Sequence, residues 1–419
     1  MKNDEYLIYI NWDGFGRYYY DIANSDTYKG TTNLNSLIKE GVFFEKLYTG
    51  IPSITYPMQS AIVSGSYSEH TENVYKYYSK EEKKLILCRR KNSAETIGQV
   101  LYRENIPFVS VQQFALLEKG AQWDEKNRLY IQPGGDYKNR FKELFKLLEG
   151  KEIISKDKAF SYEELPRVIF LYVDDLDSIG HNQLYKRGKL RAFTEKGRVR
   201  NVVNRLLQMD KMLGELIDKL KALNIYDKTT ILLTTDHGMV PYKGKSCFDA
   251  LSQALKALSY ASVKALDKEG QQGELEENEV IAVSAGVQLQ LYFKDSCKNK
   301  LEEIKKALQQ EEYVETVLTK YDLSERGTAE FFADILVSPK PPYHFHLGEK
   351  NSFLLGGAHD SLNEKAQHIF GVLKGNYFKQ NYKCMEKVNN IDFIPTICTA
   401  LSLPLPANSR GKILKSILK

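Results

Sequence analysis

Three short apolar runs, each followed by an acidic or histidine-bearing turn, restrict most strongly what this chain can fold into. Near-continuous apolar segments of this kind are typical of strands buried on both faces of a sheet. Between the second and third runs, apolar residues recur at the spacing of one buried helix face. A strand, a helix and another strand predict a parallel pair with a right-handed crossover, and hence a doubly wound α/β sheet. The runs are YLIYINW (6–12), RVIFLYV (167–173) and TTILLTT (229–235).

The pattern changes near residue 262, which suggests a second structural unit. A polar, glycine-bearing loop is followed by short strand-like and helix-like segments as far as SPKPPYHFHLG. We therefore predict a small inserted α+β subdomain at 262–350, over the active-site edge of a core formed by 1–261 and 351–419. The segment FLLGGAHD is expected to bring the chain back to the central sheet. A chain of 419 residues is long enough to bury such a core.

Composition excludes several classes of protein. The 42% hydrophobic and 27% charged content is that of a globular chain. A net charge of +5, with both signs interleaved, gives no support for nucleic-acid binding. No apolar run is long enough to predict a membrane span. Five scattered cysteines without CxxC spacing indicate free thiols, and the first residues lack a signal-peptide pattern, so we predict a cytoplasmic protein. The sequence carries no signal for an oligomeric state.

Three histidines occur in the turns that follow apolar runs. Ligands of open α/β sheets bind beyond the carboxyl ends of the strands, where such turns lie. One histidine there would usually be a hydrogen-bonded structural residue, but three turns together favour a shared site. Oxygen and nitrogen donors without thiolates suit zinc, with manganese as the second choice. The candidate donors are Asp13, Asp177, His181, Asp236, His237 and His359.

A hydroxyl-bearing segment, GIPSITYPMQSAIVSG, precedes an expected helix. Ser53 or Thr55 can be read simply as the helix cap. Alternatively, Ser53 is a nucleophile, because a hydroxyl becomes reactive when a metal lowers its pKa and a helix N-terminus favours the anion.

Five segments carry a resemblance that spans nearly the whole chain. In order they are NWDGFG, GIPSITYP, DLDSIGH, TTDHGM and GGAHD. The set resembles the alkaline phosphatase superfamily, and is most similar to its nucleotide pyrophosphatase/phosphodiesterase (type I phosphodiesterase) branch. The closing segment DFIPTICTALSLPLPANSRGKIL resembles the end of that superfamily as well. The resemblance implies an α/β sandwich with a central, mostly parallel sheet.

The same resemblance implies a site with two metal ions and a covalent intermediate. One ion would be held by Asp177, His181 and His359, and the other by Asp13, Asp236 and His237. Ser53 stands directly after the proline of a P-T-x-T-F-P motif, where the branch has its nucleophile, so a phospho-Ser53 intermediate is expected and Ser53 counts among the metal-site residues. Asn73 is the candidate for phosphate binding. This chain differs from the branch in having Ser53 for threonine and Met58 for asparagine.

We therefore predict a metal-dependent phosphodiesterase of the nucleotide pyrophosphatase type, acting on a small phosphate ester such as a nucleotide. Diesters are expected to be preferred, because no lysine or arginine lies between Lys46 and Lys76 to balance the second charge of a monoester; Arg17 is the one candidate from elsewhere. The alternatives are a phosphomonoesterase or a cofactor-independent phosphomutase of the same superfamily. A non-enzymatic metal-binding scaffold is disfavoured, because all six metal donors and a hydroxyl are present.

Three further patterns compete with this interpretation. GMVPYKGKS resembles a phosphate-binding loop but has five residues between its glycines where four are needed. SITYP lacks the proline and arginine that the nucleophile motif of sulfatases requires. His344 and His346 share one face of a predicted strand, as a metal pair or as packed ring systems.

Overall fold

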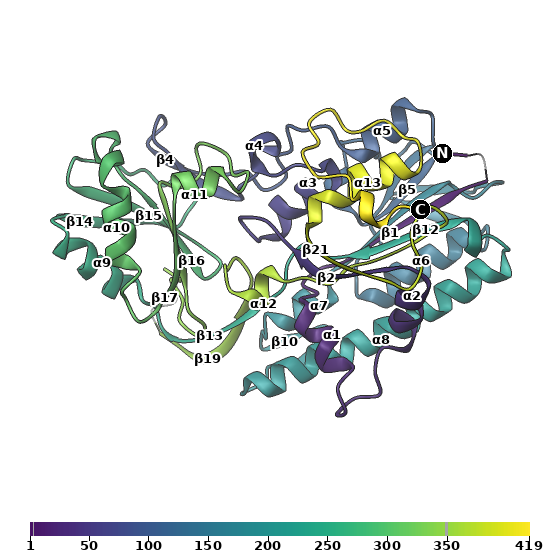
Figure 1. Ribbon diagram of the computed structural model, residues 1–419, viewed down its shortest axis with the longest axis horizontal. Coiled ribbons are helices and arrows are strands. Elements are labelled where there is room, and N and C mark those ends of the chain that lie inside the picture. The colour runs from purple at the N-terminus through teal and green to yellow at the C-terminus, as the bar shows by residue number, and fades with distance from the viewer. Residues whose placement is uncertain (3, 348–350) are drawn as a thin grey trace.

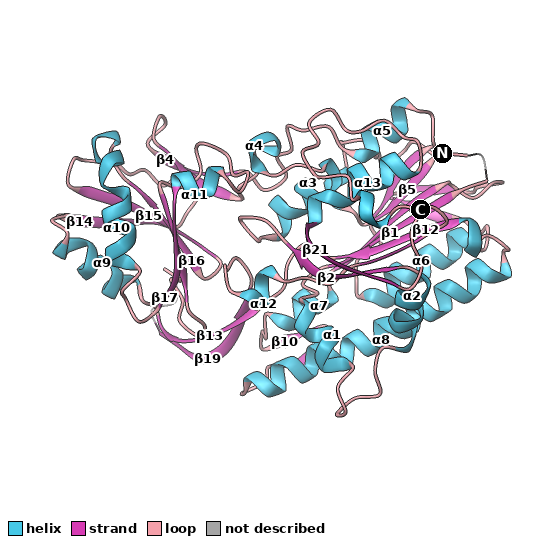
Figure 2. Cartoon of the chain, in the orientation of Figure 1, coloured by secondary structure: helices cyan, strands magenta, loops and turns pink. Residues whose placement is uncertain are grey.

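A large, mainly parallel sheet forms the centre of the larger part of the molecule in the computed structural model, which describes residues 1–2, 4–347 and 351–419 (Figures 1 and 2). Seven of its eight described strands run in one direction, and β20 alone runs antiparallel to its neighbours. The predicted α/β fold with a mostly parallel sheet is confirmed. In spatial order the strands are β21 (Tyr382–Asn389), β2 (Val42–Tyr48), β20 (Val372–Lys374), β12 (Thr229–Thr234), β1 (Tyr6–Trp12), β9 (Val168–Val173), β5 (Phe108–Val111) and β6 (Arg128–Ile131).

The three apolar runs of the sequence lie side by side in this sheet. Strand β1 pairs in parallel with β12 on one side and with β9 on the other, so it separates the two strands that were predicted to pair directly. Helix α8 (Glu195–Ala222) makes the crossover between β9 and β12. Because Asn11 is in register with Thr234 and Trp12 with Val173, all three strands end at the same edge of the sheet.

Helices cover both faces of the sheet. The side chains of each strand alternate between the two faces, so each face carries apolar side chains that a layer of helices buries. Along β1, Ile8 and Ile10 belong to one hydrophobic core, and Leu7 and Tyr9 belong to the other. The first core is covered by α8 with α1 (Arg17–Ala23), α2 (Thr32–Glu40) and α6 (Tyr137–Leu148). The second is covered by α3 (Thr55–Ser64), α5 (Ile97–Arg103) and α13 (Phe393–Ala400).

A second, smaller sheet stands at one end of the molecule, on the left in Figure 1. Its order is β14 (Ser262–Leu266), β15 (Glu279–Ala285), β16 (Gln288–Tyr292), β18 (Ile335–Pro339) and β17 (Val314–Thr319). Helices α9 (Phe248–Ala257) and α10 (Leu301–Leu308) pack on one of its faces, and the hairpin of β3 (Lys76–Ser79) and β4 (Lys84–Leu87) packs on the other. The hydrophobic cores of the smaller sheet therefore include residues of α9 and of the hairpin, which lie outside the predicted segment 262–350. Residue 350 lies outside the described residues, and the domain boundaries stay a prediction.

A two-stranded ribbon connects the two sheets and corrects one expectation. The segment FLLGGAHD does not join the central sheet, because β19 (Asn351–Ala358) pairs antiparallel with β13 (Val240–Lys245) instead. The place beside β12 in the central sheet is taken by β20. The ribbon ends next to the carboxyl edge of the large sheet, where it delivers His359.

The remaining elements are short, and nothing helical in the described ranges is both long and apolar enough to cross a membrane. All five cysteines are buried and unpaired, as predicted. The short elements are α4 (Ser68–Thr71), α7 (Asp175–Gly180), α11 (Lys320–Ser324), α12 (Glu364–Gln367), β7 (Ile153–Ser155), β8 (Lys158–Phe160), β10 (Tyr185–Lys186) and β11 (Lys189–Leu190).

Candidate active site

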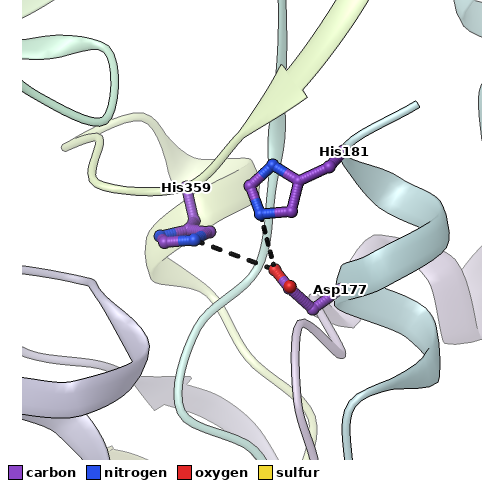
Figure 3. A group of neighbouring side chains, drawn as sticks. All are labelled: Asp177, His181 and His359. Atoms are coloured by element: carbon purple, nitrogen blue, oxygen red, sulfur yellow. Dashed lines mark ion pairs between the residues drawn. The ribbon is translucent and has the colours of Figure 1, made fainter. Parts of the chain in front are cut away.

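Asp177, His181 and His359 form a cluster at the carboxyl edge of the large sheet (Figure 3). Asp177 lies on α7, which begins directly after β9, and His181 follows one helical turn later at the end of the same helix. Nε2 of His181 lies 3.3 Å from Oδ1 of Asp177, and Nε2 of His359 lies 3.8 Å from the same oxygen. The three donor atoms thus surround a space of the size that one metal ion takes.

A second group of donors adjoins the first. Nε2 of His237 lies 3.4 Å from Oδ1 of Asp13 and 3.5 Å from Oδ2 of Asp236. Asp177 lies close enough to Asp13 and His237 to be grouped with them. The rings of His237 and His359 stack with centroids 3.9 Å apart, so the two groups form one continuous site. The structure brings together all six donors singled out from the sequence.

The three histidines share one orientation. In each, Nδ1 faces a backbone carbonyl oxygen at hydrogen-bond distance, so Nδ1 carries the proton and donates it. Nε2 then carries the lone pair and faces the carboxylate oxygens, so it is available to a metal ion, which is the arrangement of metal-binding histidines. The pairs are His181 with Gly357 (2.8 Å), His237 with Gly238 (3.0 Å) and His359 with Ser53 (3.0 Å).

The carboxylates of this site lack the hydrogen bonds that buried oxygens normally accept. Oδ1 of Asp13, Oδ1 of Asp177 and Oδ2 of Asp236 are buried without a hydrogen-bond donor among the described residues. Burial, together with the neighbouring Asp236 and Asp177 carboxylates, raises the pKa of Asp13 well above its usual range. Buried anions need a compensating cation. These residues therefore fit divalent metal ions.

Two hydroxyls of the GIPSITYP segment lie in different surroundings. Thr55, the first residue of α3, has its Oγ1 3.1 Å from Nε2 of His237. Ser53 is fully buried, and its Oγ accepts the N–H of Ser361 at 3.2 Å and donates to the Ser361 carbonyl oxygen at 3.4 Å. The backbone is extended at Ile54 and helical from Thr55 onward, which separates the two side chains. The sequence led us to expect the hydroxyl of Ser53 beside the metal donors. In the structure it is the hydroxyl of Thr55 that lies there.

The side-chain amide of Asn73 contacts backbone groups, one of which is the carbonyl oxygen of Tyr56, next to Thr55, at 3.5 Å. It is fully buried, and its Nδ2 donates to the carbonyl oxygens of Lys91 (2.8 Å) and Arg89 (3.1 Å). Its Oδ1 accepts the N–H of Tyr75 at 3.1 Å. The amide thus holds the 89–91 loop, and the phosphate-binding role of Asn73 stays a prediction.

His344 and His346, the pair of histidines noted in the sequence, serve packing. Both ring nitrogens of His344 are engaged, by the Gly244 carbonyl oxygen at 3.1 Å and by the N–H of His346 at 3.2 Å. Both histidine rings contact Tyr242, with centroids 5.2 and 4.4 Å away.

Arg17 forms ion pairs with Asp21 and Glu45, so it brings no charge to the metal donors.

Tyr172 is a residue of the site that the sequence interpretation missed. Its hydroxyl donates to Oδ2 of Asp13 from the neighbouring strand β9. The sequence signal was a tyrosine one residue before the end of an otherwise apolar strand. Gly14 contributes in the same region, because its N–H donates to Oδ1 of Asp236 at 3.3 Å.

Several known proteins are similar to this chain in sequence. A bis(5′-adenosyl)-triphosphatase of Mus musculus is 23% identical over 98% of this chain and 81% of its own length. An uncharacterized pyrophosphatase/phosphodiesterase of Schizosaccharomyces pombe is 25% identical over 56% of this chain. The chain spans 45% of that relative and 22% of a similar bovine ectonucleotide pyrophosphatase/phosphodiesterase family member 3.

Solved structures share the fold. Murine ectonucleotide pyrophosphatase/phosphodiesterase 5 superposes with a TM-score of 0.67 at 16% identity, covering 99% of this chain and 100% of the other. A family model described as type I phosphodiesterase/nucleotide pyrophosphatase matches residues 7–368. The chain therefore belongs to the type I phosphodiesterase/nucleotide pyrophosphatase family.

Proposed function

We propose that this chain is a metal-dependent hydrolase that cleaves phosphodiester or pyrophosphate bonds, with Thr55 as its nucleophile. The observation that carries the proposal is the contact of the Thr55 hydroxyl with Nε2 of His237. The same nitrogen faces Oδ1 of Asp13 and Oδ2 of Asp236, which lack a hydrogen-bond donor among the described residues. Membership of the phosphodiesterase family supports the reaction class.

Two divalent ions are proposed to bind the six donors. Asp177, His181 and His359 would hold one, and Asp13, Asp236 and His237 the other, with zinc or manganese matching three carboxylates and three imidazoles. When bound, such ions supply positive charge to the attacking and leaving oxygens.

The residues of the chain set the geometry of attack. Thr55 begins α3, whose first-turn N–H groups have no partner within the helix and favour an anion. In the proposed reaction the Thr55 oxygen forms a bond to phosphorus while the bond to the leaving oxygen breaks. Water then cleaves the threonine ester and regenerates the hydroxyl. Ser53 acts indirectly, because its carbonyl oxygen fixes the ring of His359.

A nucleotide is the proposed substrate. One similar protein is named a bis(5′-adenosyl)-triphosphatase, and one solved neighbour is murine ectonucleotide pyrophosphatase/phosphodiesterase 5 in complex with AMP. That neighbour is described as inactive and carries a threonine-to-alanine change, which is in keeping with a threonine nucleophile.

The test compares Thr55→Ala with Ser53→Ala. Hydrolysis of p-nitrophenyl 5′-thymidine monophosphate should fall by several orders of magnitude in Thr55→Ala, with bound metal and thermal stability retained. Ser53→Ala should keep turnover within about tenfold, because it loses a structural hydrogen bond of about 1 kcal/mol. The reverse pattern would return the nucleophile to Ser53.

A panel of substrates distinguishes between the alternative functions that the sequence left open. Comparison of kcat/KM for bis-p-nitrophenyl phosphate and p-nitrophenyl phosphate distinguishes a diesterase from a monoesterase. Isomerisation of a sugar phosphate without release of phosphate would identify a mutase. Metal-loaded protein that turns over no ester at all would leave only the binding scaffold.

A further inference from the structure

The hairpin of β10 and β11 exposes a group of large apolar side chains. Twelve such side chains are exposed in the described part of the chain, and four of them lie within residues 184–193. Single exposed apolar residues are common, whereas a local group of them marks an interaction site. Tyr185 and Leu190 are direct partners across the two strands, so their side chains lie on one face. The exposed fractions are 75% for Leu184, 65% for Tyr185, 71% for Leu190 and 83% for Phe193.

The β10–β11 hairpin is fixed to the core at both of its ends. At its base, Nδ2 of Asn182 donates to the carbonyl oxygen of Leu355 on β19 at 2.9 Å. At its tip, the guanidinium group of Arg187 donates to both carboxylate oxygens of Asp174, each at 2.9 Å. The carbonyl oxygen of Arg187 accepts a hydrogen bond from Arg205 on α8 at 2.7 Å. The apolar side chains are therefore presented to solvent by an ordered backbone.

The same part of the chain is strongly basic. Residues 183–200 contain seven lysines and arginines but one carboxylate, that of Glu195, which pairs with Arg198 at 2.7 Å. Arg187 is balanced by Asp174 in the same way. The other five cations form no ion pair with the described residues, and they are Lys186, Lys189, Arg191, Lys196 and Arg200.

Two of these cations are placed where they repel each other. Lys186 and Lys189 are direct partners across the strands of the hairpin. Like charges in such a pair destabilise a two-stranded ribbon, because the side chains are neighbours on one face. An anion that binds both ammonium groups would remove the repulsion.

Anionic lipid bilayers match both properties of this surface. Apolar side chains enter the boundary between head groups and acyl chains, while lysines and arginines attract negatively charged head groups. A single-stranded nucleic acid would also pair with the cations, but Leu184 and Leu190 offer no ring on which a base could stack. The combination of exposed leucines, aromatic rings and cations therefore favours a membrane surface.

We propose that the β10–β11 hairpin docks the protein onto bilayers that contain anionic lipids. The leucines and aromatic rings enter the outer part of the bilayer, and the five cations bind the head groups. Such docking lies on the surface and needs no helix that crosses the membrane. Since β10 follows His181 by four residues, the docked protein holds its metal donors close to the lipid surface. Lipid binding does not depend on the proposed hydrolase function.

Cosedimentation with vesicles tests the charged part of the surface. Wild-type protein should bind vesicles of phosphatidylcholine and phosphatidylserine at least about tenfold more tightly than vesicles of phosphatidylcholine alone. Lys186→Gln combined with Lys189→Gln should weaken binding to the anionic vesicles about tenfold. The matched control, Lys300→Gln combined with Lys306→Gln, removes two exposed lysines beside the second sheet and should change binding less than twofold.

The apolar part is tested with the same vesicles. Phe193→Ser should weaken binding about tenfold, because a phenyl ring no longer leaves water. Tyr321→Ser removes a similarly exposed ring on α11 and should have no effect. All these side chains are exposed or half-buried, so the melting temperatures should match that of the wild type.

Fluorescence shows whether the hairpin itself enters the lipid. In Phe193→Trp, the emission of the new tryptophan should move to shorter wavelength when anionic vesicles are added, because the indole leaves water. Tyr321→Trp should show no such shift. A shift in both variants, or in neither, would contradict docking through the hairpin.

Three further results would overturn the inference. Wild-type protein that fails to bind anionic vesicles would exclude lipid docking. Binding that survives both the lysine and the Phe193 changes would place the contact elsewhere on the protein. Tight binding of a fluorescent single-stranded oligonucleotide at the same salt concentration, without binding to vesicles, would identify the hairpin as a nucleic-acid surface instead.

Discussion

Tyr172 orients the carboxylate of Asp13, and its removal should weaken metal binding. Its hydroxyl donates to Oδ2 of Asp13, which leaves Oδ1 facing His237. Partners of metal ligands typically contribute about 10- to 100-fold to metal affinity. Tyr172→Phe should therefore bind zinc more weakly by such a factor, as measured by competition with a chromogenic chelator.

The matched control for this change is Tyr226→Phe. The Tyr226 hydroxyl also donates to a carboxylate, Oε2 of Glu40 at 2.6 Å, but far from the metal donors. Equal zinc affinity in wild type and Tyr172→Phe, or an equal loss in both variants, would show that the hydroxyl of Tyr172 has no special role at the site.

Asp175 gives the protein a predictable dependence on pH. Burial raises its pKa to about 6, although Arg205 beside it acts in the opposite direction. A raised pKa contributes stability that is present below the unfolded value of about 3.9 and lost as pH rises through the folded value. The isosteric Asp175→Asn does not titrate. Its free energy of unfolding relative to wild type should therefore increase by about 1 kcal/mol between roughly pH 5 and pH 7.5.

Urea unfolding of both proteins at the two pH values checks this expectation. Asp175→Asn also loses the ion pair with Arg205. This loss shifts the free energy of unfolding of the variant by the same amount at both pH values, so it cancels when the two are compared. A difference that stays constant or falls with pH would mean that Asp175 keeps an ordinary pKa in the folded protein.

At the scale of single residues, the sequence predicted donor types better than hydroxyl positions. The six candidate metal donors follow strand ends or a tight turn, so residue type and place were enough to predict that they lie close together. Ser53 and Thr55 are both hydroxyls two residues apart in one motif, and only the start of α3 at Thr55 decides which one faces His237. The contacts of Asn73 were not predictable, because side-chain type says nothing about which backbone carbonyls an amide will meet.

The contact between the end of β1 and helix α7 depends on Gly14. Its φ is +77°, and a Cβ placed there would lie 2.8 Å from the Cα of Asp177. Gly14→Ala should therefore push α7 away, which lowers both stability and zinc affinity. The backbone conformation alone costs about 1–2 kcal/mol for a side chain, and the clash with α7 adds to it.

Gly134→Ala isolates the backbone contribution. Gly134 has a similar φ of +63°, and no atom lies within 4 Å of the place that a methyl group would take there. Gly134→Ala should lose about 1 kcal/mol of stability and bind zinc normally. Thermal unfolding and zinc titration of both variants decide the point, and equal losses in the two would show that the approach of α7 does not matter.

At the scale of elements, periodicity predicted the buried strands but not the partner of each. The apolar runs of β1, β9 and β12 are buried on both faces, which their composition reveals directly. Strand β19 contains the same kind of apolar run, yet it pairs with β13. Which strands pair depends on the three-dimensional path of the chain. Between β13 and β19 that path forms the second sheet.

At the scale of the whole molecule, two sheets meet at one site. The large sheet supplies most donors from its strand ends, and the ribbon from the second sheet brings His359 and Asp360. The sequence predicted an insertion here because its composition changes. It did not reveal that the β3–β4 hairpin packs on the inserted sheet, because that contact joins segments almost 200 residues apart, such as Tyr78 and Gly273.

Removal of metal should destabilise the whole protein as well as abolish its hydrolase activity. Ions that bind only the folded state add about 4 kcal/mol of stability at a thousandfold excess over their dissociation constant. Chelation should accordingly lower the melting temperature by several degrees, and added zinc or manganese should restore both the melting temperature and the activity.

The size of this effect should grow with pH. In the metal-free protein, burial and the neighbouring carboxylates raise the pKa of Asp13. The stability that protonated Asp13 contributes is present below its unfolded pKa and is lost as pH rises through the folded pKa. Bound cations remove this loss, because they favour the ionised carboxylate. The gap in melting temperature between loaded and chelated protein should thus widen from about pH 5.5 to pH 7.5. A gap of zero at both values would contradict the metal site, because six converging donors with unpaired carboxylate oxygens cannot bind a cation without stabilising the fold that assembles them.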